Sequence, residues 1–212
     1  SRALARPELQ PASVVGVGWD GVVKGLFFVT DAIKPTSAEA VVALKSLDLN
    51  LIMITGDNQA VAEMVAEKVG IDNVIAQALP KEKLARVAQW QSEGLQVAVI
   101  GDGVNDAPAL AQGDLGIAIG TGTDVAIEAS DLTLVSGDLR AAADAIALAR
   151  RTFSTIRGNL FWAFAYNVAA IPLAAFGLLN PVIAAAAMGF SSVFVVTNSL
   201  RLRRFKGYRA KQ

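Results

Sequence analysis

Two carboxylates stand four residues apart in the glycine-rich segment Gly101-Asp-Gly-Val-Asn-Asp106. The apolar run Val97–Ile100 precedes it and predicts a buried strand, so Asp102 and Asp106 would follow the carboxyl end of that strand. Carboxylate oxygens are ligands that Mg²⁺ prefers, and glycines let a phosphate approach the backbone closely. Asp, Asn and Gly are also ordinary turn residues. The segment therefore predicts either a magnesium site for phosphoryl transfer or a turn that binds nothing.

Two other segments could contact a phosphoryl group. The segment Thr55-Gly-Asp-Asn58 follows the apolar run Leu51–Ile54, and its hydroxyl group and backbone amides could bind phosphate oxygens. A capped loop explains this segment almost as well. Lys83 could bind phosphate as a cation, although taken alone it is better explained as a solvated helix residue. A hydroxyl, a lysine and paired carboxylates on successive units of one sheet together favour phosphoryl transfer.

The elements that must position these side chains alternate along the chain. Apolar runs predict short strands at Val14–Gly18, Val22–Val29, Leu51–Ile54, Val74–Ala76, Val97–Ile100, Gly116–Ile119 and Leu132–Val135. Helices are predicted after Pro35, at Gln59–Val69, at Lys81–Glu93 and from Pro108. Continuous apolar strands alternating with helices indicate an α/β fold with a parallel sheet covered on both faces. Ligands bind beyond the carboxyl ends of such strands, where Thr55, Asp57, Asp102 and Asp106 all fall.

The charge of the 212-residue chain is zero only because two parts cancel. Residues 1–149 contain all 19 acidic residues and 10 basic ones, whereas residues 150–212 contain nine basic residues and no acidic one. An acidic first part argues against nucleic acid as a partner. The chain has no Cys and no His, which excludes a disulfide scaffold, a thiol nucleophile and any His-based triad or metal site within it.

The basic part contains an uncharged run from Asn159 to Ser199, divided by a Gly-Leu-Leu-Asn-Pro turn. About 20 residues of helix cross the hydrocarbon core of a bilayer, so the run predicts two transmembrane helices at about 159–178 and 181–200. A buried helical hairpin of a soluble protein is the alternative. Basic residues flank both outer ends of the run, which predicts a multi-pass protein of the cell membrane. Residues 1–157 and the C-terminal tail would then be cytoplasmic.

The combined motifs resemble the phosphorylation domain of a heavy-metal P-type ATPase, a member of the haloacid-dehalogenase-like superfamily. The resemblance rests on Thr55–Asn58, Lys83, the ten-residue loop Gly101–Leu110 and its continuation Gly116–Glu128. It implies a haloacid-dehalogenase-like Rossmannoid sheet followed by a two-helix transmembrane hairpin. It also implies ATP-driven ion pumping through an aspartyl-phosphate intermediate, with ATP as substrate and Mg²⁺ as cofactor.

The same resemblance assigns roles to individual residues. Thr55 would bind the phosphoryl group, Lys83 would stabilise its charge and Asp102 would ligate Mg²⁺. Asn105 and Asp106 would support the same site, with Asp106 at the magnesium. The catalytic residues that it implies are Thr55, Gly56, Asp57, Lys83 and Asn105.

One part of the family pattern is absent. The Asp-Lys-Thr-Gly-Thr string that carries the phosphorylated aspartate does not occur in these 212 residues, and Gly120-Thr-Gly-Thr-Asp124 lacks its Asp-Lys pair. The actuator domain, most of the nucleotide-binding domain, the earlier membrane helices and their Cys-Pro-Cys motif are also missing. We therefore expect the C-terminal part of a pump, unable by itself to form the covalent intermediate. Its parts would be the tail of the nucleotide-binding domain (1–22), an incomplete phosphorylation domain (23–145) and a membrane domain (146–212).

Polar residues at membrane depth suggest which ion is carried. Tyr166 and Asn167 lie in the first apolar segment, and Met188, Ser191 and Ser192 share a helical face in the second. Interhelical packing would explain them too. A thioether, however, is a soft ligand that suits Cu(I), and neither segment contains a carboxylate or His for a harder ion. The pattern resembles the monovalent-copper branch of these pumps, although Ag(I) has similar chemistry.

The partners implied are the lipid bilayer, the remainder of the pump and a copper chaperone. Two other hypotheses stay open. One is a membrane-anchored phosphatase of the same superfamily, which needs a nucleophilic Asp followed two residues later by Asp or Thr; Asp31 has Ile33 at that position. The other is a non-enzymatic fragment that regulates a complete pump.

Overall fold

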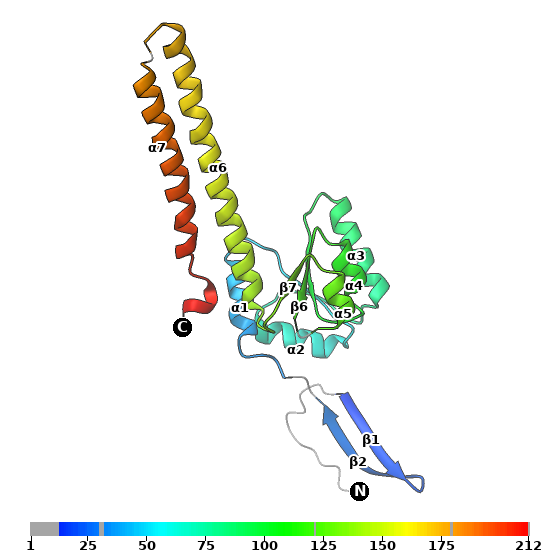
Figure 1. Cartoon of the computed structure of the whole chain (residues 1–212). Helices are drawn as coiled ribbons and strands as arrows, with labels where there is room; N and C mark the ends of the chain where they lie inside the picture. Colours follow the sequence, from blue (N-terminus) through cyan, green and yellow to red (C-terminus); the bar gives the residue numbers. More distant parts are fainter. Residues whose placement is uncertain (1–12, 30–31, 121, 179, 212) are drawn as a thin grey trace. The chain divides into compact units, whose positions relative to one another are not determined.

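The computed structural model describes residues 13–29, 32–120, 122–178 and 180–211 (Figure 1). The chain divides into two compact units, Ser1–Ala142 and Ala143–Gln212. Asp31, the candidate nucleophile of the phosphatase hypothesis, lies outside the described residues.

The first unit opens with a hairpin of β1 (Ser13–Trp19) and β2 (Val22–Val29). The strands are antiparallel and are joined by Asp20 and Gly21, whose φ angles are 54° and 72°. A two-residue hairpin turn with positive φ at both positions follows the right-handed twist of its strands, and Asp-Gly adopts it readily. The hairpin predicted from these residues is confirmed.

Short parallel strands follow the hairpin and alternate with helices. The strands are β3 (Ile52–Ile54), β4 (Asn73–Ile75), β5 (Ala98–Gly101), β6 (Leu115–Ile119) and β7 (Leu132–Leu134). The helices between them are α1 (Ser37–Lys45), α2 (Gln59–Val69), α3 (Pro80–Ser92), α4 (Ala107–Gln112) and α5 (Asp124–Glu128). The alternation confirms the predicted α/β fold, and Figure 1 shows helices on both sides of β6 and β7. Helix α5 was missed because its five residues are too few for a periodic pattern.

The strands do not form one continuous sheet among the described residues. Strand β3 pairs with β4, and β5, β6 and β7 pair in that order, so β3 and β5 are each hydrogen-bonded on one edge only. Strand β5 also begins one residue later than predicted, since the Val97 amide donates to the Asp114 carboxylate at 2.8 Å. That bond lowers the pKa of Asp114, together with a hydrogen bond from Gln91.

Local signals set the ends of the helices that carry the site. The Asn58 carboxamide accepts from the Val61 amide at 3.0 Å and caps α2, which closes at Gly70 with φ 82°. Helix α3 begins at Pro80, and the Glu82 carboxylate accepts from the Leu79 amide at 2.8 Å. These are the bonds that the first turn of a helix otherwise lacks.

The core behind β5, β6 and β7 is small and aliphatic. Ile117, Leu134 and Ala142 are buried there against Ile100, Leu115, Leu132 and Ala141. Ile117 and Leu110 are the largest side chains that are fully buried. The loops that follow β5 and β6 therefore begin at strands that are fixed by a well-packed core.

The second unit is a helical hairpin. Helix α6 (Arg140–Ala175) begins well before the predicted span of 159–178 and ends shortly before the end of that span, and α7 (Pro181–Leu200) returns beside it (Figure 1). The Asn159 carboxamide donates to the Ser199 hydroxyl at 3.1 Å and accepts from the Asn198 carboxamide at 2.8 Å, which fixes the register between the helices. Within the described residues, one helical segment, Ala184–Arg204, has the length and apolar composition to cross a membrane.

Candidate functional site

The loop after β3 is held by main-chain bonds from the loop after β4. The Ala78 amide donates to the Thr55 carbonyl at 2.9 Å, and the Gln77 amide donates to the Asp57 carbonyl at 2.8 Å. Within the loop, the Thr55 hydroxyl donates to the Asp57 carboxylate at 2.8 Å and accepts from the Asp57 amide at 3.1 Å. Thr55 is half-buried, while Gly56 and Asp57 are exposed. The predicted phosphoryl-binding residues thus form a fixed loop with an open face.

The structure brings Lys83 and Asp106 together. The Lys83 ammonium lies 2.7 Å from the Asp106 carboxylate, and the two side chains are 16% and 20% exposed. Lys83 belongs to the first turn of α3, and Asp106 is the residue before α4. The pair is more shielded from water than a surface ion pair, so its charges interact through a less screening medium. Lys83 is therefore not the fully solvated residue that its position alone would indicate.

A glycine makes room for Asp106. A Cβ at Gly101 would lie 2.6 Å from the Asp106 Cβ, closer than real side chains approach. The last residue of β5 must therefore lack a side chain for the carboxylate to reach Lys83. The spacing of Gly101 and Asp106 thus has a packing reason as well as a chemical one.

Asp102 is placed differently from Asp106. It is exposed, and neither its carboxylate nor the Asn105 carboxamide hydrogen-bonds to another side chain in the part of the chain that the structure describes. Among the residues that the structure describes, no group of three or more Asp, Glu, His or Cys residues converges on a metal position. Mg²⁺ does not require such a group, because it commonly takes one or two carboxylates together with water and substrate phosphates. Asp102 and Asp106, in one loop beyond β5, fit that donor set.

Sequence reasoning missed the loop that supports Asp102. The Thr123 amide donates to the Asp102 carbonyl at 2.9 Å, so the segment after β6 contacts the main chain of the carboxylate loop. The glycines of Gly120-Thr-Gly-Thr-Asp124, directly after an apolar strand, were the available signal for a close backbone approach.

The residues predicted for the transported ion divide between two environments. Tyr166 and Ser191 are half-buried in the hairpin, whereas Asn167, Met188 and Ser192 are exposed. The Asn167 carboxamide donates to the Ala163 carbonyl at 2.6 Å, and the Ser192 hydroxyl donates to the Met188 carbonyl at 3.1 Å. The Asn167 and Ser192 side chains are thus bonded to their own helices, and all three exposed side chains are open to a partner beyond the hairpin.

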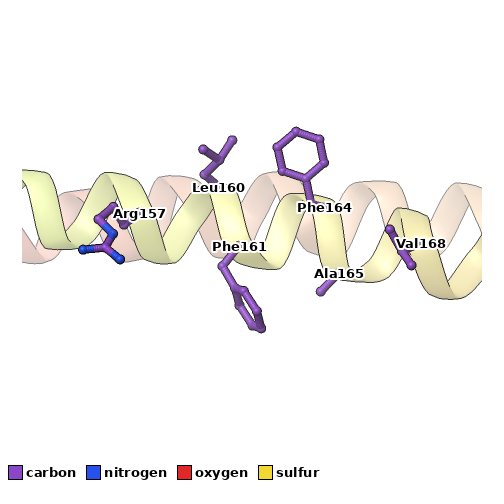
Figure 2. Close-up of a pocket in the computed structure, with 6 residues that line it drawn as sticks. All are labelled: Arg157, Leu160, Phe161, Phe164, Ala165 and Val168. Atoms are coloured by element: carbon purple, nitrogen blue, oxygen red, sulfur yellow. The ribbon is translucent and has the colours of Figure 1, made fainter.

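A depression of about 670 Å³ lies on α6 (Figure 2). It is lined by Arg157, Leu160, Phe161, Phe164, Ala165 and Val168. Its lining is apolar except for Arg157 at one end, and it contains none of the predicted ion ligands.

Comparisons with known proteins identify the family of the chain. The model of the haloacid dehalogenase-like hydrolase family matches residues 4–114. The chain is 58% identical over 203 residues to a probable copper-exporting P-type ATPase of Mycobacterium tuberculosis, covering 96% of this chain and 26% of that protein. It is 54% identical over 199 residues to a copper-exporting P-type ATPase of Bacillus subtilis, covering 94% of this chain and 25% of that protein.

Solved structures give the same picture. A zinc-transporting PIB-type ATPase in its E2·Pi state superposes with a TM-score of 0.79 at 33% identity, over 90% of this chain and 31% of that one. The chain therefore spans about a quarter of the curated relatives and about a third of this solved structure. The predicted resemblance to heavy-metal P-type ATPases is confirmed. The chain belongs to the haloacid dehalogenase-like hydrolase family and corresponds to one segment of a P-type ATPase.

Proposed function

We propose that the chain is the C-terminal portion of an ATP-driven pump that exports Cu(I) through an aspartyl-phosphate intermediate. The observation that carries the proposal is the Lys83–Asp106 ion pair beside the exposed Asp102. A cation and two carboxylates at the end of one strand form the polar half of a phosphoryl-transfer site. The Thr55 loop, at the end of β3, supplies the other half through a hydroxyl group and a main-chain amide.

The residues would divide the work by their chemistry. Thr55 and Gly56 would hold the phosphoryl oxygens through the Thr55 hydroxyl group and the Gly56 amide, and Asp57 would fix the loop by its bonds to Thr55. The Lys83 ammonium would offset the charge of the transferring group. Mg²⁺, when bound by Asp102 and Asp106, neutralises phosphate oxygens. Asn105, exposed in the same loop, would donate a hydrogen bond to the phosphoryl group or its water shell.

The nucleophilic aspartate would come from an upstream strand. Strands β3 and β5 each have an edge without a strand partner in the described structure, and Thr55 and Asp102 directly follow these two strands. A parallel strand between β3 and β5 would pair with both free edges. It would join the five parallel strands, β3 to β7, into one six-stranded sheet. An aspartate at its carboxyl end would then stand between the Thr55 loop and Asp102, where both halves of the site can reach it.

Copper is favoured as the transported ion by two independent observations. The curated relatives at 58% and 54% identity are named as copper exporters, whereas the zinc-transporting structure is 33% identical. The exposed Met188, together with Asn167 and Ser192, offers soft and neutral donors. Ag(I) would bind the same donors. These side chains would face the other membrane helices of the pump, while Tyr166 and Ser191 would support them from within the hairpin.

The register of the hairpin supports the proposed placement in the membrane. The Asn159 contact with Asn198 and Ser199 puts Arg157 and Arg201 at the same end of α6 and α7. Both ends of the hairpin would then be cytoplasmic, because basic residues stay on that side. The partners would be the bilayer, the actuator and nucleotide-binding domains, the remaining membrane helices and a copper chaperone. No observation favours the phosphatase or the regulatory fragment over this proposal.

The test is ATP hydrolysis by the complete pump in membrane vesicles, with Cu(I) or Zn²⁺ as the added ion. Hydrolysis stimulated by Cu(I), with an acid-stable phosphoenzyme, supports the proposal. Stimulation by Zn²⁺ without Cu(I) contradicts the copper assignment, and hydrolysis without a phosphoenzyme contradicts the pump mechanism.

A further inference from the structure

The segment after β6 touches the Asp102 loop through main-chain atoms. The Thr123 amide donates to the Asp102 carbonyl at 2.9 Å. A Cβ at Gly122 would lie within 3.0 Å of the Asp102 carbonyl oxygen, a separation that real Cβ atoms do not show, and 2.8 Å from the Ile119 carbonyl oxygen. Gly122 and Thr123 are therefore packed directly against the peptide group of Asp102.

This support is itself anchored on both sides. The Gly122 amide donates to the Ile119 carbonyl at 2.7 Å, at the end of β6. The Thr123 hydroxyl accepts from the Ala126 amide at 3.4 Å and caps α5, whose Ala126 is fully buried. A segment fixed at the strand and at the helix can hold a neighbouring main chain in place.

Asp102 needs such a support because its side chain has none. Its carboxylate is exposed and makes no hydrogen bond within the described residues, so the position of the carboxylate depends on that of its main chain. Mg²⁺ demands near-ideal octahedral geometry at about 2.0–2.1 Å, and a ligand moved by a few tenths of an ångström binds it less well.

We propose that Gly122 and Thr123 are positioning residues, which hold the Asp102 carbonyl so that the Asp102 carboxylate is preset for Mg²⁺. The inference rests on the proposed function, since it takes Asp102 as a magnesium ligand. Gly122 and Thr123 would then do more than form a turn.

Gly122→Ala tests the packing contact. The three nearest atoms to the added Cβ are all backbone atoms of Asp102 and Ile119, so no side chain can move aside and one of the two loops must shift. Gly116→Ala is the matched control. Its Cβ would lie 2.6 Å from the Leu110 carbonyl oxygen, again a backbone atom, but its near neighbours belong to Leu110 and Ser130 instead of Asp102.

A second pair of variants tests the hydrogen bond. Thr123 has φ −73°, which proline adopts without strain, so Thr123→Pro removes the amide donor together with the hydroxyl cap. Thr123→Ala removes the hydroxyl cap alone and leaves the bond to Asp102. The difference between these two variants therefore reports the loss of the main-chain bond together with the displacement of the Asp102 carbonyl by the proline ring, and both effects move the Asp102 main chain.

The experiment uses the complete pump and two readouts. One is the Mg²⁺ concentration for half-maximal phosphorylation by ATP, and the other is the rise in unfolding temperature on adding Mg²⁺ without nucleotide. Mutation of residues that orient a metal ligand typically lowers metal affinity by about 10–100-fold. We therefore expect the Mg²⁺ concentration for half-maximal phosphorylation to rise by at least about tenfold in Gly122→Ala and Thr123→Pro. The Mg²⁺-induced rise in unfolding temperature should shrink in parallel.

Gly116→Ala should lower the unfolding temperature without Mg²⁺ but leave the half-maximal Mg²⁺ concentration unchanged. An equal Mg²⁺ dependence in Gly122→Ala and Gly116→Ala would overturn the inference, as would an equal dependence in the two Thr123 variants. If Asp102→Asn abolishes phosphorylation while Gly122→Ala keeps normal Mg²⁺ dependence, only the positioning role is wrong. If the unmodified pump is not phosphorylated at all, the proposed function itself is wrong.

Discussion

The Lys83 ammonium lies 2.7 Å from the Asp106 carboxylate, although the two residues are 23 positions apart in the sequence. The contact joins the first turn of α3 to the loop beyond β5. It shields a lysine that would otherwise be solvated and brings it to the loop that contains Asp102. The first prediction depends on this contact.

Lys83→Met should reduce phosphorylation of the complete pump by at least about tenfold, because the phosphoryl group and Asp106 both lose their cation. Hydrogen bonds to charged groups contribute about 1.5–3 kcal/mol, so the free energy of unfolding should also fall by about that amount. Phosphorylation with labelled ATP measures the first effect and chemical denaturation the second. Lys81→Met, at an exposed position in the same helical turn, should leave both values unchanged. Equal effects of the two substitutions would show that the ion pair has no special role.

Asp102→Asn tests the proposed magnesium ligand. We expect phosphorylation to fall by at least about 10²-fold, which corresponds to about 2.7 kcal/mol at 1.36 kcal/mol per decade. Asp72→Asn is the control, since the Asp72 carboxylate forms an exposed ion pair with Lys45 away from the site. Asp114 is unsuitable as a control because its carboxylate accepts from the Val97 amide at the start of β5. If the pump with Asp102→Asn is phosphorylated as readily as the unmodified pump, the Asp102 carboxylate is not a required ligand of Mg²⁺.

The ion pairs of Arg140 predict that the stability of the fold depends on pH. Its guanidinium bonds to Asp138 at 2.9 Å and to Glu39 in α1 at 2.8 Å, and its side chain is 11% exposed. The bonds from Arg140 hold the pKa of Asp138 below its ordinary value. A carboxyl group with a lowered folded-state pKa stabilises the fold above its unfolded-state pKa of about 3.9. That stabilisation is lost as the pH falls through the folded-state pKa.

Arg140→Met should therefore lower the Tm of the chain in detergent by on the order of 5 °C at pH 7. The difference from the unmodified chain should begin to narrow below about pH 4 and should close as the pH falls through the lowered folded-state pKa of Asp138. Lys45→Met breaks an ion pair of α1 whose side chains are 42% and 81% exposed, and it should change the Tm little at any pH. A Tm difference for Arg140→Met that stays constant down to pH 2 would contradict the assignment to Asp138.

Met188→Ala should lower Cu(I) binding and copper-stimulated turnover of the complete pump, because it removes the soft donor of the proposed ion site. Asn167→Ala and Ser192→Ala should have smaller effects in the same direction. Folding should be preserved, since Met188 is 65% exposed on α7 and leaves no buried cavity. Competition with a chromogenic chelator measures the Cu(I) stoichiometry.

Val193→Ala is the matched control for Met188→Ala, because Val193 is also 65% exposed on α7. Unchanged Cu(I) stoichiometry and turnover in all three site variants would show that these residues serve in helix packing and do not bind the ion. Turnover stimulated by Zn²⁺ in the unmodified pump would remove the copper assignment itself.

Much of the fold follows from short-range signals in the sequence. Asp20-Gly21 makes a tight hairpin turn, Asn58 caps α2 and Gly70 closes it, each through contacts within a few residues. The loops with Thr55 and Asp102 were located for a similar reason, since an apolar strand followed by glycine and carboxylate is a local pattern. Boundaries moved by a residue where a distant group intervened, as Asp114 does at Val97.

Other features were decided only by tertiary structure. The pairing of Lys83 with Asp106, of Arg140 with Glu39 across 101 residues, and of Thr123 with Asp102 depends on which elements pack together. The same holds for the environments of Met188 and Ser191, which differ although the two residues are one turn apart. The sequence by itself determined which side chains stand at the strand ends, because that depends on the local backbone. Which of them meet, and which stay open to a ligand or a partner, depends on long-range packing that no local pattern encodes.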